Sequence, residues 1–391
     1  MIRVLTNRRI FEYDIHSLIK AFYPGEEISF FYCEDDDLSR FDPEQIGAGQ
    51  YLVFTVRYTD SACLTACCEN GRLCGEEASS YDKDMISPDS GRAGTDLKNI
   101  VKRTLYRLLS FVTGKELPWG TLTGIRPTRL VMRLLSRGES DDGIRQELKR
   151  EYYISDEKLG LSLEIAKRER SIIDASQGAR GYSLYIGIPF CPTTCLYCSF
   201  TSFPIAKWRK RVGDYITALK KELRAASEML EGRRPDTVYI GGGTPTSLEP
   251  EELSEILLYI GECFDLSALA ELTVEAGRPD SITAEKLAVL KEKGVSRISI
   301  NPQTMNDGTL KAIGRRHTAG CFRDAFFMAR EAGFDNINTD LILGLPGEGE
   351  NEVKRTFSEI EKLGPDSVTV HCLAVKRAAA LSEYVKGLGT G

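Results

Sequence analysis

Three closely spaced cysteines are the first candidates for chemistry in this sequence. Cys191, Cys195 and Cys198 stand in "YIGIPFCPTTCLYCSF", at spacing C-x3-C-x2-C, directly after an apolar run. A closed structural zinc site takes four protein ligands, whereas three thiolates on an iron–sulfur cluster leave one iron open to a substrate or cofactor. The spacing alone also allows a zinc site with a fourth ligand elsewhere, or three unrelated thiols.

Glycine-rich and polar segments follow later apolar runs of the chain. "GGGTPTSL" begins at Gly241, and missing side chains there allow the backbone to approach a ligand closely, although a glycine turn by itself is more often an ordinary strand-to-helix turn. The segments "VEAGRPD", "NPQTMNDGTLKAIGRRHT" and "DLILGLPGE" carry carboxylate, amide and guanidinium groups. A polar set of this kind is difficult to explain as core, and it comprises Glu275, Gln303, Arg315 and Asp340.

The elements that must position these residues alternate regularly from about residue 183 onward. Short apolar runs occur at "SLYIGIPF", "TVYIGGG", "ELTVEAG", "RISINPQ", "NINTDLILGLP" and "SVTVHCLA", with helical periodicity between most of them. About six βα units predict parallel strands joined by right-handed crossovers. We expect an α/β fold, a partial (β/α)6 TIM-like barrel, because no signal of strand-order reversal favours the open doubly wound alternative. Its chemistry should lie at the carboxyl ends of the strands.

The N-terminal part has a different pattern of strand-like and helical stretches, which predicts a second, smaller domain. Strand-like and turn-rich stretches alternate to about residue 115, Asn70-Gly71 reads as a two-residue hairpin turn, and residues 95–175 are mostly helical. A chain of 391 residues exceeds the size at which single cores stop growing, roughly 250 to 300 residues. We therefore expect an accessory α+β and helical domain at 1–175, a linker within 174–183, and the barrel at 176–391.

Composition excludes several classes of protein. The net charge is −6, with 42% hydrophobic and 28% charged residues, which does not indicate disorder or a nucleic-acid-binding protein. No secretory leader and no apolar run of about 18 residues is visible, so neither export nor a membrane span is predicted. Eleven cysteines are too dilute for a disulfide scaffold, and a reducing cytoplasm is the expected location.

In order and spacing, the motifs together resemble the radical S-adenosylmethionine superfamily. Within it they are similar to the oxygen-independent coproporphyrinogen III oxidase/dehydrogenase family, and the segment "PWGTLTGIRPT" is similar to its HemZ-like group. The resemblance implies a [4Fe–4S] cluster held by the three cysteines, with S-adenosylmethionine on the open iron and no further catalytic side chain assigned. The implied cofactor contacts are Tyr185, Tyr197, Gly242, Gly243, Thr244, Glu275, Gln303, Arg315, Asp340 and Ala374.

The same resemblance implies a reaction and its partners. Two propionates of coproporphyrinogen III would undergo oxidative decarboxylation to vinyl groups, giving protoporphyrinogen IX in haem biosynthesis, with a low-potential electron donor as partner. Ser199 and Phe200 follow the last cysteine where established dehydrogenases have another cysteine, a pattern more like the haem chaperones of the family. The chain stops at Gly391, so we expect the C-terminal region that covers the substrate to be missing. A haem-binding chaperone and a radical enzyme that modifies RNA or protein are the alternatives.

Other chemically capable residues receive structural interpretations. Cys63, Cys67, Cys68 and Cys74 flank the predicted hairpin turn, where alternation sends them to different faces, so we favour core thiols over a second metal site. An arginine series is interpreted as a solvated helix face rather than a binding surface. We assign no role to His317 or His371. The arginines are Arg126, Arg129, Arg133 and Arg137, and the isolated thiols expected to be structural are Cys33, Cys263, Cys321 and Cys372.

Overall fold

The computed structural model describes residues 1–33, 52–86, 92–124, 126–175, 181–376 and 379–381. The chain divides into two compact units, Met1–Ile173 and Asp174–Gly391, beside the boundary expected at residue 175. Part of the predicted linker, residues 176–180, lies outside the described residues.

The first unit contains a five-stranded mixed sheet of order β2-β1-β3-β4-β5. β1 pairs in parallel with β2 and β3, and β3, β4 and β5 pair antiparallel. The predicted hairpin turn is confirmed, because Asn70 and Gly71 join β4 to β5 with backbone φ angles of 50° and 77°. The strands are β1 (Ile2–Thr6), β2 (Ile28–Tyr32), β3 (Leu52–Tyr58), β4 (Ala62–Glu69) and β5 (Arg72–Ser80).

Helices of the first unit bury one face of this sheet and then form a small cluster of their own. α2 packs against β4 and β5, and its leucines share a core with the inner residues of β1, β3 and β4. A separate apolar cluster joins α3, α4 and α5. The helices are α1 (Glu12–Phe22), the short η2 (Lys83–Ile86), α2 (Arg92–Thr113), α3 (Thr128–Ser136), α4 (Asp141–Tyr152) and α5 (Asp156–Ala175).

The second unit is built on a six-stranded parallel sheet in which the strand order follows the chain, β13-β12-β11-β10-β9-β6. All six predicted strands are present, and an uninterrupted order without reversal is the arrangement of a partial barrel rather than of a doubly wound sheet. The predicted fold class is therefore confirmed. The strands are β6 (Tyr182–Ile188), β9 (Pro235–Gly242), β10 (Glu271–Glu275), β11 (Arg297–Ser299), β12 (Ile337–Leu343) and β13 (Ser367–Cys372).

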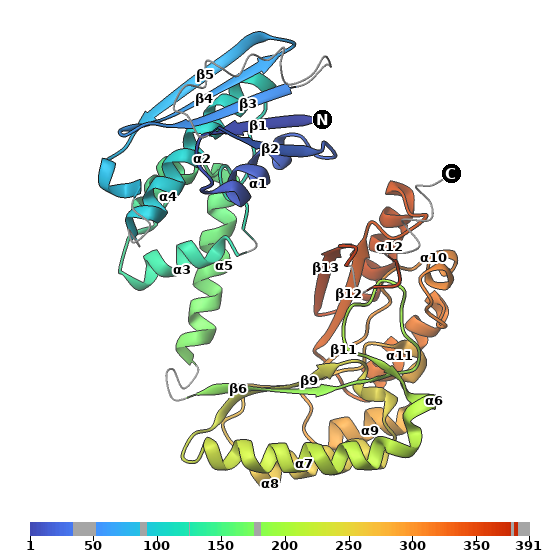
Figure 1. Cartoon of the computed structure of the whole chain (residues 1–391). Helices are drawn as coiled ribbons and strands as arrows, with labels where there is room; N and C mark the ends of the chain where they lie inside the picture. The colour runs from blue at the N-terminus through green and yellow to red at the C-terminus, as the bar shows by residue number, and fades with distance from the viewer. Residues whose placement is uncertain (34–51, 87–91, 125, 176–180, 377–378, 382–391) are drawn as a thin grey trace. The chain divides into compact units, whose positions relative to one another are not determined.

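Amphipathic helices cover the outer face of this sheet, as α7, α8 and α9 do beneath β6 and β9 in Figure 1. α7 shows why: Val212, Ile216, Leu219 and Leu223 are its buried residues, at the spacing of one helical face. Side-chain hydroxyls cap α9 and α11. The longer helices are α7 (Val212–Met229), α8 (Pro250–Cys263), α9 (Ala284–Glu292), α10 (Asp307–Ala312), α11 (Ala319–Glu331) and α12 (Glu350–Leu363).

Short elements occupy the loops that follow the first strands of the barrel. β7 (Phe190–Cys191) and β8 (Phe203–Pro204) pair across the base of the cysteine loop, and α6 (Ile205–Trp208) and η4 (Arg209–Arg211) lead into α7. η5 (Pro245–Ser247) and η6 (Pro279–Ser281) shape the turns after β9 and β10. The motifs found in the sequence thus lie at the carboxyl ends of the strands, as expected.

Candidate functional site

The three cysteines and most of the predicted cofactor residues line a single cavity of about 210 Å³ at the carboxyl end of the sheet. Ala374 alone among the predicted residues is absent from its lining, and it borders a second cavity of about 590 Å³. Glu275, Gln303 and Asp340 border both cavities. The first cavity is lined by Cys191, Cys195, Cys198, Tyr185, Tyr197, Gly242, Gly243, Thr244, Glu275, Gln303, Arg315 and Asp340, together with residues that the sequence did not single out.

The cysteine loop is fixed by the body of the barrel. The Leu196 amide donates to the carbonyl oxygen of Ile313 at 3.0 Å, and the Cys198 amide donates to the carbonyl oxygen of Cys195 at 3.1 Å. Within the described residues, no three His, Cys, Asp or Glu side chains are grouped to hold one metal ion. A cubane cluster takes each thiolate on a different iron, so this finding bears on the mononuclear zinc alternative and not on a cluster.

Two of the thiols have polar neighbours. Cys191 Sγ lies 3.4 Å from Thr244 Oγ1, and Cys195 Sγ lies 3.7 Å from a guanidinium nitrogen of Arg278. Burial raises the pKa of the Cys191 thiol, and the hydrogen bond from Thr244 opposes that rise. A thiol of this kind is a poor nucleophile by itself, but coordination to a metal deprotonates it. The loop is therefore better suited to binding metal than to covalent catalysis.

The glycine turn after β9 brings backbone against backbone. The amides of Gly243 and Thr244 donate to the carbonyl oxygens of Ile188 and Phe190, both at 2.7 Å. A Cβ atom on Gly243 would lie 2.6 Å from the Phe190 oxygen, and Gly242 has a φ of 104° that other residues rarely adopt. Both glycines are thus required by the turn itself, which holds the second strand end against the cysteine loop.

Glu275 ends β10 and points into the cavity beside a tyrosine of β9. The phenol of Tyr239 donates to Glu275 Oε1 at 2.5 Å. Burial raises the pKa of Glu275, and the hydrogen bond from the phenol opposes that rise. Burial also raises the pKa of Tyr239, with the adjacent carboxylate adding to the effect. A backbone hydrogen bond from Gly242 also lowers the pKa of Glu275, so the phenol and the glycine turn together orient this carboxylate at the cavity.

Gln303 and Arg315 present buried polar atoms without protein partners among the described residues. Gln303 Oε1 and Arg315 Nε are both unpaired, and each side chain is 7% exposed. Arg315 Nη1 donates to the carbonyl oxygen of Asn301 and, at 3.4 Å, to that of Gly277. An unpaired buried polar group costs free energy unless a ligand satisfies it. These atoms therefore indicate that the cavity is built to receive a polar molecule.

The carboxylate of Asp340 is oriented by two side-chain amides. Asn338 Nδ2 donates to Asp340 Oδ1 at 2.7 Å, and Asn301 Nδ2 donates to Asp340 Oδ2 at 2.9 Å. The Asp340 amide in turn donates to Asn301 Oδ1 at 3.1 Å. The closed set of hydrogen bonds fixes the carboxylate at the wall between the two cavities.

The aromatic positions differ in burial. Tyr185 is 62% exposed and stacks on Tyr239 with ring centroids 5.8 Å apart, so it forms an open edge of the first cavity. Tyr197 is held among buried groups, and that burial raises the pKa of its phenol. Ala374 is exposed at the second cavity. Tyr197 thus belongs to the packed wall and Tyr185 to the mouth.

Several site residues escaped the sequence analysis. Tyr239 stands two residues before Gly241 on β9, so strand alternation places both on the cavity face, and this signal could have identified it. Arg278 and Asp280 were quoted within "VEAGRPD" without a role. Asn301 and Asn338 belong to no motif with a known role. Their side-chain amides donate to the Asp340 carboxylate, a contact that only the folded structure shows.

The residues given structural interpretations are not among those that line this cavity. Cys63 and Cys67 are buried in the core of the first unit. His317 is 4% exposed, and burial lowers its pKa to about 3, so the ring is neutral at physiological pH. His371 borders the second cavity. The four arginines of the series are exposed, and they are Arg126, Arg129, Arg133 and Arg137.

Comparisons with known proteins identify the class. The family model of the radical SAM superfamily matches residues 185–360, so this part of the chain is a radical SAM domain. The chain is 42% identical over 319 residues to the oxygen-independent coproporphyrinogen-III oxidase-like protein HemZ of Bacillus subtilis, covering 80% of this chain and 64% of HemZ. It is 39% identical over 197 residues to the heme chaperone HemW of Bacillus subtilis, covering 50% of this chain and 51% of HemW.

Among solved structures, coproporphyrinogen III oxidase HemN of Escherichia coli matches with 27% identity and a TM-score of 0.48, covering 56% of each chain. The chain thus spans between half and two thirds of the length of these relatives.

The residues present fit the cofactors of this superfamily, a [4Fe–4S] cluster and S-adenosylmethionine. The chemistry of the donors is suitable: three thiols are available for three irons, and carboxylate, amide and guanidinium groups are available for ribose hydroxyls, an ammonium and a carboxylate. The unpaired atoms of Gln303 and Arg315 supply polar groups that such a ligand would satisfy.

Proposed function

We propose that this chain is the radical enzyme core of an oxygen-independent coproporphyrinogen III dehydrogenase, which converts two propionates to vinyl groups and forms protoporphyrinogen IX. The observation that carries the proposal is the convergence of three thiols and the cofactor-type polar groups on one cavity, in a chain 42% identical to HemZ over 319 residues. With cofactors bound, one-electron cleavage of the sulfonium would supply a carbon radical able to remove a hydrogen atom.

The chain's own residues would bind the cluster, orient the cofactor and shield the reaction from water. Cys191, Cys195 and Cys198 would hold the cluster, the glycine turn and Arg315 would hold the methionine end of the cofactor, and Glu275 would hold its ribose. Each propionate would lose a hydrogen atom, carbon dioxide and one electron, so a one-electron acceptor is needed as well as a donor. The barrel's role is positioning and exclusion of water and oxygen.

The second cavity supports a substrate that carries carboxylates. It adjoins the first one through Glu275, Gln303 and Asp340, and it presents the cationic side chains of Arg297 and Lys376. Guanidinium and ammonium groups are the usual partners of carboxylates. Beside the carboxylates of Glu275 and Asp340, this cavity therefore offers two cationic groups to a carboxylate-bearing substrate such as coproporphyrinogen. Among the described helices, none has the length and hydrophobicity of a membrane span.

A haem chaperone is the second candidate, and two observations favour it. The chain is 39% identical to the heme chaperone HemW over 197 residues, and Ser199 and Phe200 stand where dehydrogenases have a further cysteine. Ser199 and Phe200 are exposed, and both border the second cavity.

Anaerobic incubation with S-adenosylmethionine, a reductant and coproporphyrinogen III distinguishes the candidates. Protoporphyrinogen IX formed together with 5′-deoxyadenosine supports the dehydrogenase. Stoichiometric haem binding without turnover contradicts it and supports the chaperone. If 5′-deoxyadenosine forms without protoporphyrinogen IX and without haem binding, the substrate is a different one, such as an RNA or a protein that the enzyme modifies. The Cys191→Ala variant is the matched control for each measurement.

A further inference from the structure

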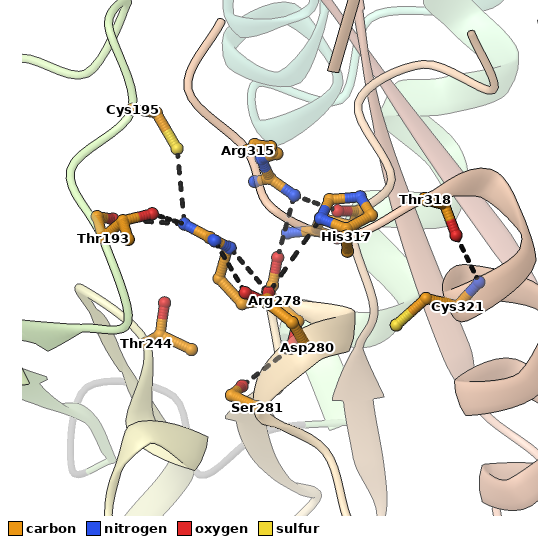
Figure 2. Close-up of polar contacts among 12 residues, drawn as sticks. Thr193, Cys195, Thr244, Arg278, Asp280, Ser281, Arg315, His317, Thr318 and Cys321 are labelled. Atoms are coloured by element: carbon orange, nitrogen blue, oxygen red, sulfur yellow. Dashed lines mark hydrogen bonds and ion pairs between the residues drawn. The ribbon is translucent and has the colours of Figure 1, made fainter. Parts of the chain in front are cut away.

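A buried arginine outside the predicted ligand set contacts the cysteine loop. Arg278 follows β10 and is 2% exposed. Its Nη1 donates to the carbonyl oxygen and to the hydroxyl oxygen of Thr193, both at 3.1 Å, and lies 3.7 Å from Cys195 Sγ (Figure 2). Because an arginine side chain stays protonated in proteins, a full positive charge stands beside the thiol.

The other edge of the same guanidinium is anchored by a carboxylate. Arg278 Nε and Nη2 donate to the two oxygens of Asp280, each at 2.9 Å. Burial would raise the pKa of Asp280, but the hydrogen bonds and charge of Arg278 outweigh it and hold that pKa below its usual value. The bidentate pair fixes the plane of the guanidinium, so its Nη1 edge has a defined direction toward Thr193 and Cys195.

A chain of buried hydrogen bonds connects this pair to the glycine turn. Ser281 Oγ donates to the carbonyl oxygen of Arg278 at 2.7 Å and lies 2.7 Å from Thr246 Oγ1. Lys286 Nζ donates to the carbonyl oxygens of Thr246 and Ser281 at 2.7 and 3.1 Å. The loops after β6, β9 and β10 are therefore joined by one polar network, in which Arg278 contacts Cys195.

We propose that Arg278 is a positioning residue that orients the cysteine loop and, by a charged hydrogen bond to Cys195, raises the reduction potential of the cluster. This inference rests on the ligation of iron by Cys195, and it goes beyond the reaction proposed above. Reduction adds negative charge to the cluster and its sulfurs, and a nearby cation with an N–H donor stabilises that charge. Arg278 would thus ease the electron transfer that every reaction of this site requires.

A purely structural role for Arg278 makes a different prediction, and the potential distinguishes the two. If Arg278 served only to fasten the loop to Asp280 and Thr193, its loss would reduce stability or iron binding and leave the potential of the bound cluster unchanged. If it acts on the cluster, the potential changes even where iron binding is complete. The measurement is made without porphyrinogen, so it does not depend on which substrate the protein uses.

The test uses full-length Arg278→Gln and Arg278→Lys, purified anaerobically and reconstituted with iron and sulfide. Iron content, circular dichroism and an EPR-monitored redox titration are recorded for each. We expect full iron content in both variants. The reduction potential of the cluster should be highest in the wild type, lower in Arg278→Lys and lowest in Arg278→Gln. The difference between the wild type and Arg278→Gln should be roughly 59 mV, which corresponds to a tenfold change for one electron. Lysine keeps the positive charge but lacks the planar N–H donors of the guanidinium, which explains why its reduction potential should be intermediate.

A partly exposed arginine supplies the matched control. Arg323 pairs with Glu359 at 2.7 Å on the helical surface of the same unit, so Arg323→Gln removes an equal charge far from the loop's hydrogen bonds. Its potential should equal that of the wild type. An unchanged potential in a fully loaded Arg278→Gln overturns the proposal. If Arg278→Gln does not fold, the reduction potential of Arg278→Lys provides the test. A potential equal to that of the wild type overturns the proposal, and a lower potential supports it.

Discussion

Tyr239 and Glu275, from neighbouring strands, meet directly above a residue without a side chain. Their 2.5 Å hydrogen bond passes over Gly241, where a Cβ atom would lie 2.7 Å from the Tyr239 ring and 2.9 Å from the Glu275 carboxyl carbon. Gly241, near the end of β9, thus makes room for a tyrosine–carboxylate pair.

Removal of the phenol should weaken cofactor binding. Tyr239→Phe keeps the ring that stacks on Tyr185 but frees Glu275 to change rotamer, so we expect the dissociation constant for S-adenosylmethionine to rise several-fold. Glu275→Gln removes the carboxylate itself, and an increase of about tenfold or more, about 1.4 kcal/mol, is expected. Anaerobic calorimetry measures both. Tyr259→Phe, on α8, is the control, and equal affinities in all four proteins would contradict the assignment of Glu275 to the ligand.

Iron binding should depend on one group of cysteines and not on the other. Replacing Cys191, Cys195 and Cys198 together with alanine should abolish the brown colour and the bound iron, because no thiolate then remains in the cavity. The Cys63→Ala, Cys67→Ala double variant should retain both, since those thiols lie in an apolar core. Iron analysis and absorption spectra after anaerobic reconstitution provide the measurement. Loss of iron from the Cys63→Ala, Cys67→Ala variant would indicate instead that the N-terminal unit binds metal.

A single methyl group at the glycine turn should be costly. In Gly243→Ala the new Cβ would stand 2.6 Å from the carbonyl oxygen of Phe190, and relieving this overlap should reduce the free energy of unfolding by about 1–3 kcal/mol and lower iron content. Gly261→Ala is the matched control, because its Cβ would meet nothing within 4 Å on exposed α8 and should stabilise the helix by about 0.5–1 kcal/mol. Thermal unfolding monitored by circular dichroism compares the two. Equal melting temperatures would contradict the crowding at residue 243.

Acid should destabilise the barrel through His317. Its folded pKa of about 3 lies below the unfolded value of 6.5, so the unfolded chain binds more protons between these limits. The stabilisation is complete above pH 6.5 and is lost as the pH falls, by about 2 kcal/mol at pH 5. In His317→Gln this loss should be absent, so its unfolding midpoint in urea should fall less between pH 7 and pH 5 than that of the wild type. Parallel declines would show that His317 does not titrate in this way.

The order of apolar runs and motifs was sufficient to predict the barrel, because each strand and its following polar segment are local in sequence. Glu275 ends β10, Thr244 follows shortly after β9, and Asp340 lies within β12. Parallel strands bring their carboxyl ends to one edge. Ala374 is predicted beside the cofactor by resemblance alone, and in the structure it lines the adjoining cavity.

What the sequence could not supply were contacts between loops. Arg278 depends on Thr193 and Cys195, which lie on the loop after another strand, and Asn301 depends on Asp340. Such pairings are set by the geometry of the folded barrel and leave no periodicity to detect. His317 likewise offered no signal that its ring is buried and neutral, because burial is a property of its surroundings.

Arg315 is oriented before any ligand arrives. Two backbone carbonyls, of Asn301 and Gly277, hold its Nη1, so little side-chain entropy remains to be lost on binding, and the guanidinium has no freedom to follow a ligand of different shape. A molecule that places no acceptor opposite Nε leaves that buried donor unsatisfied. A ligand whose acceptor groups do not match this fixed guanidinium would therefore be rejected by the fold itself, before any rearrangement of the site.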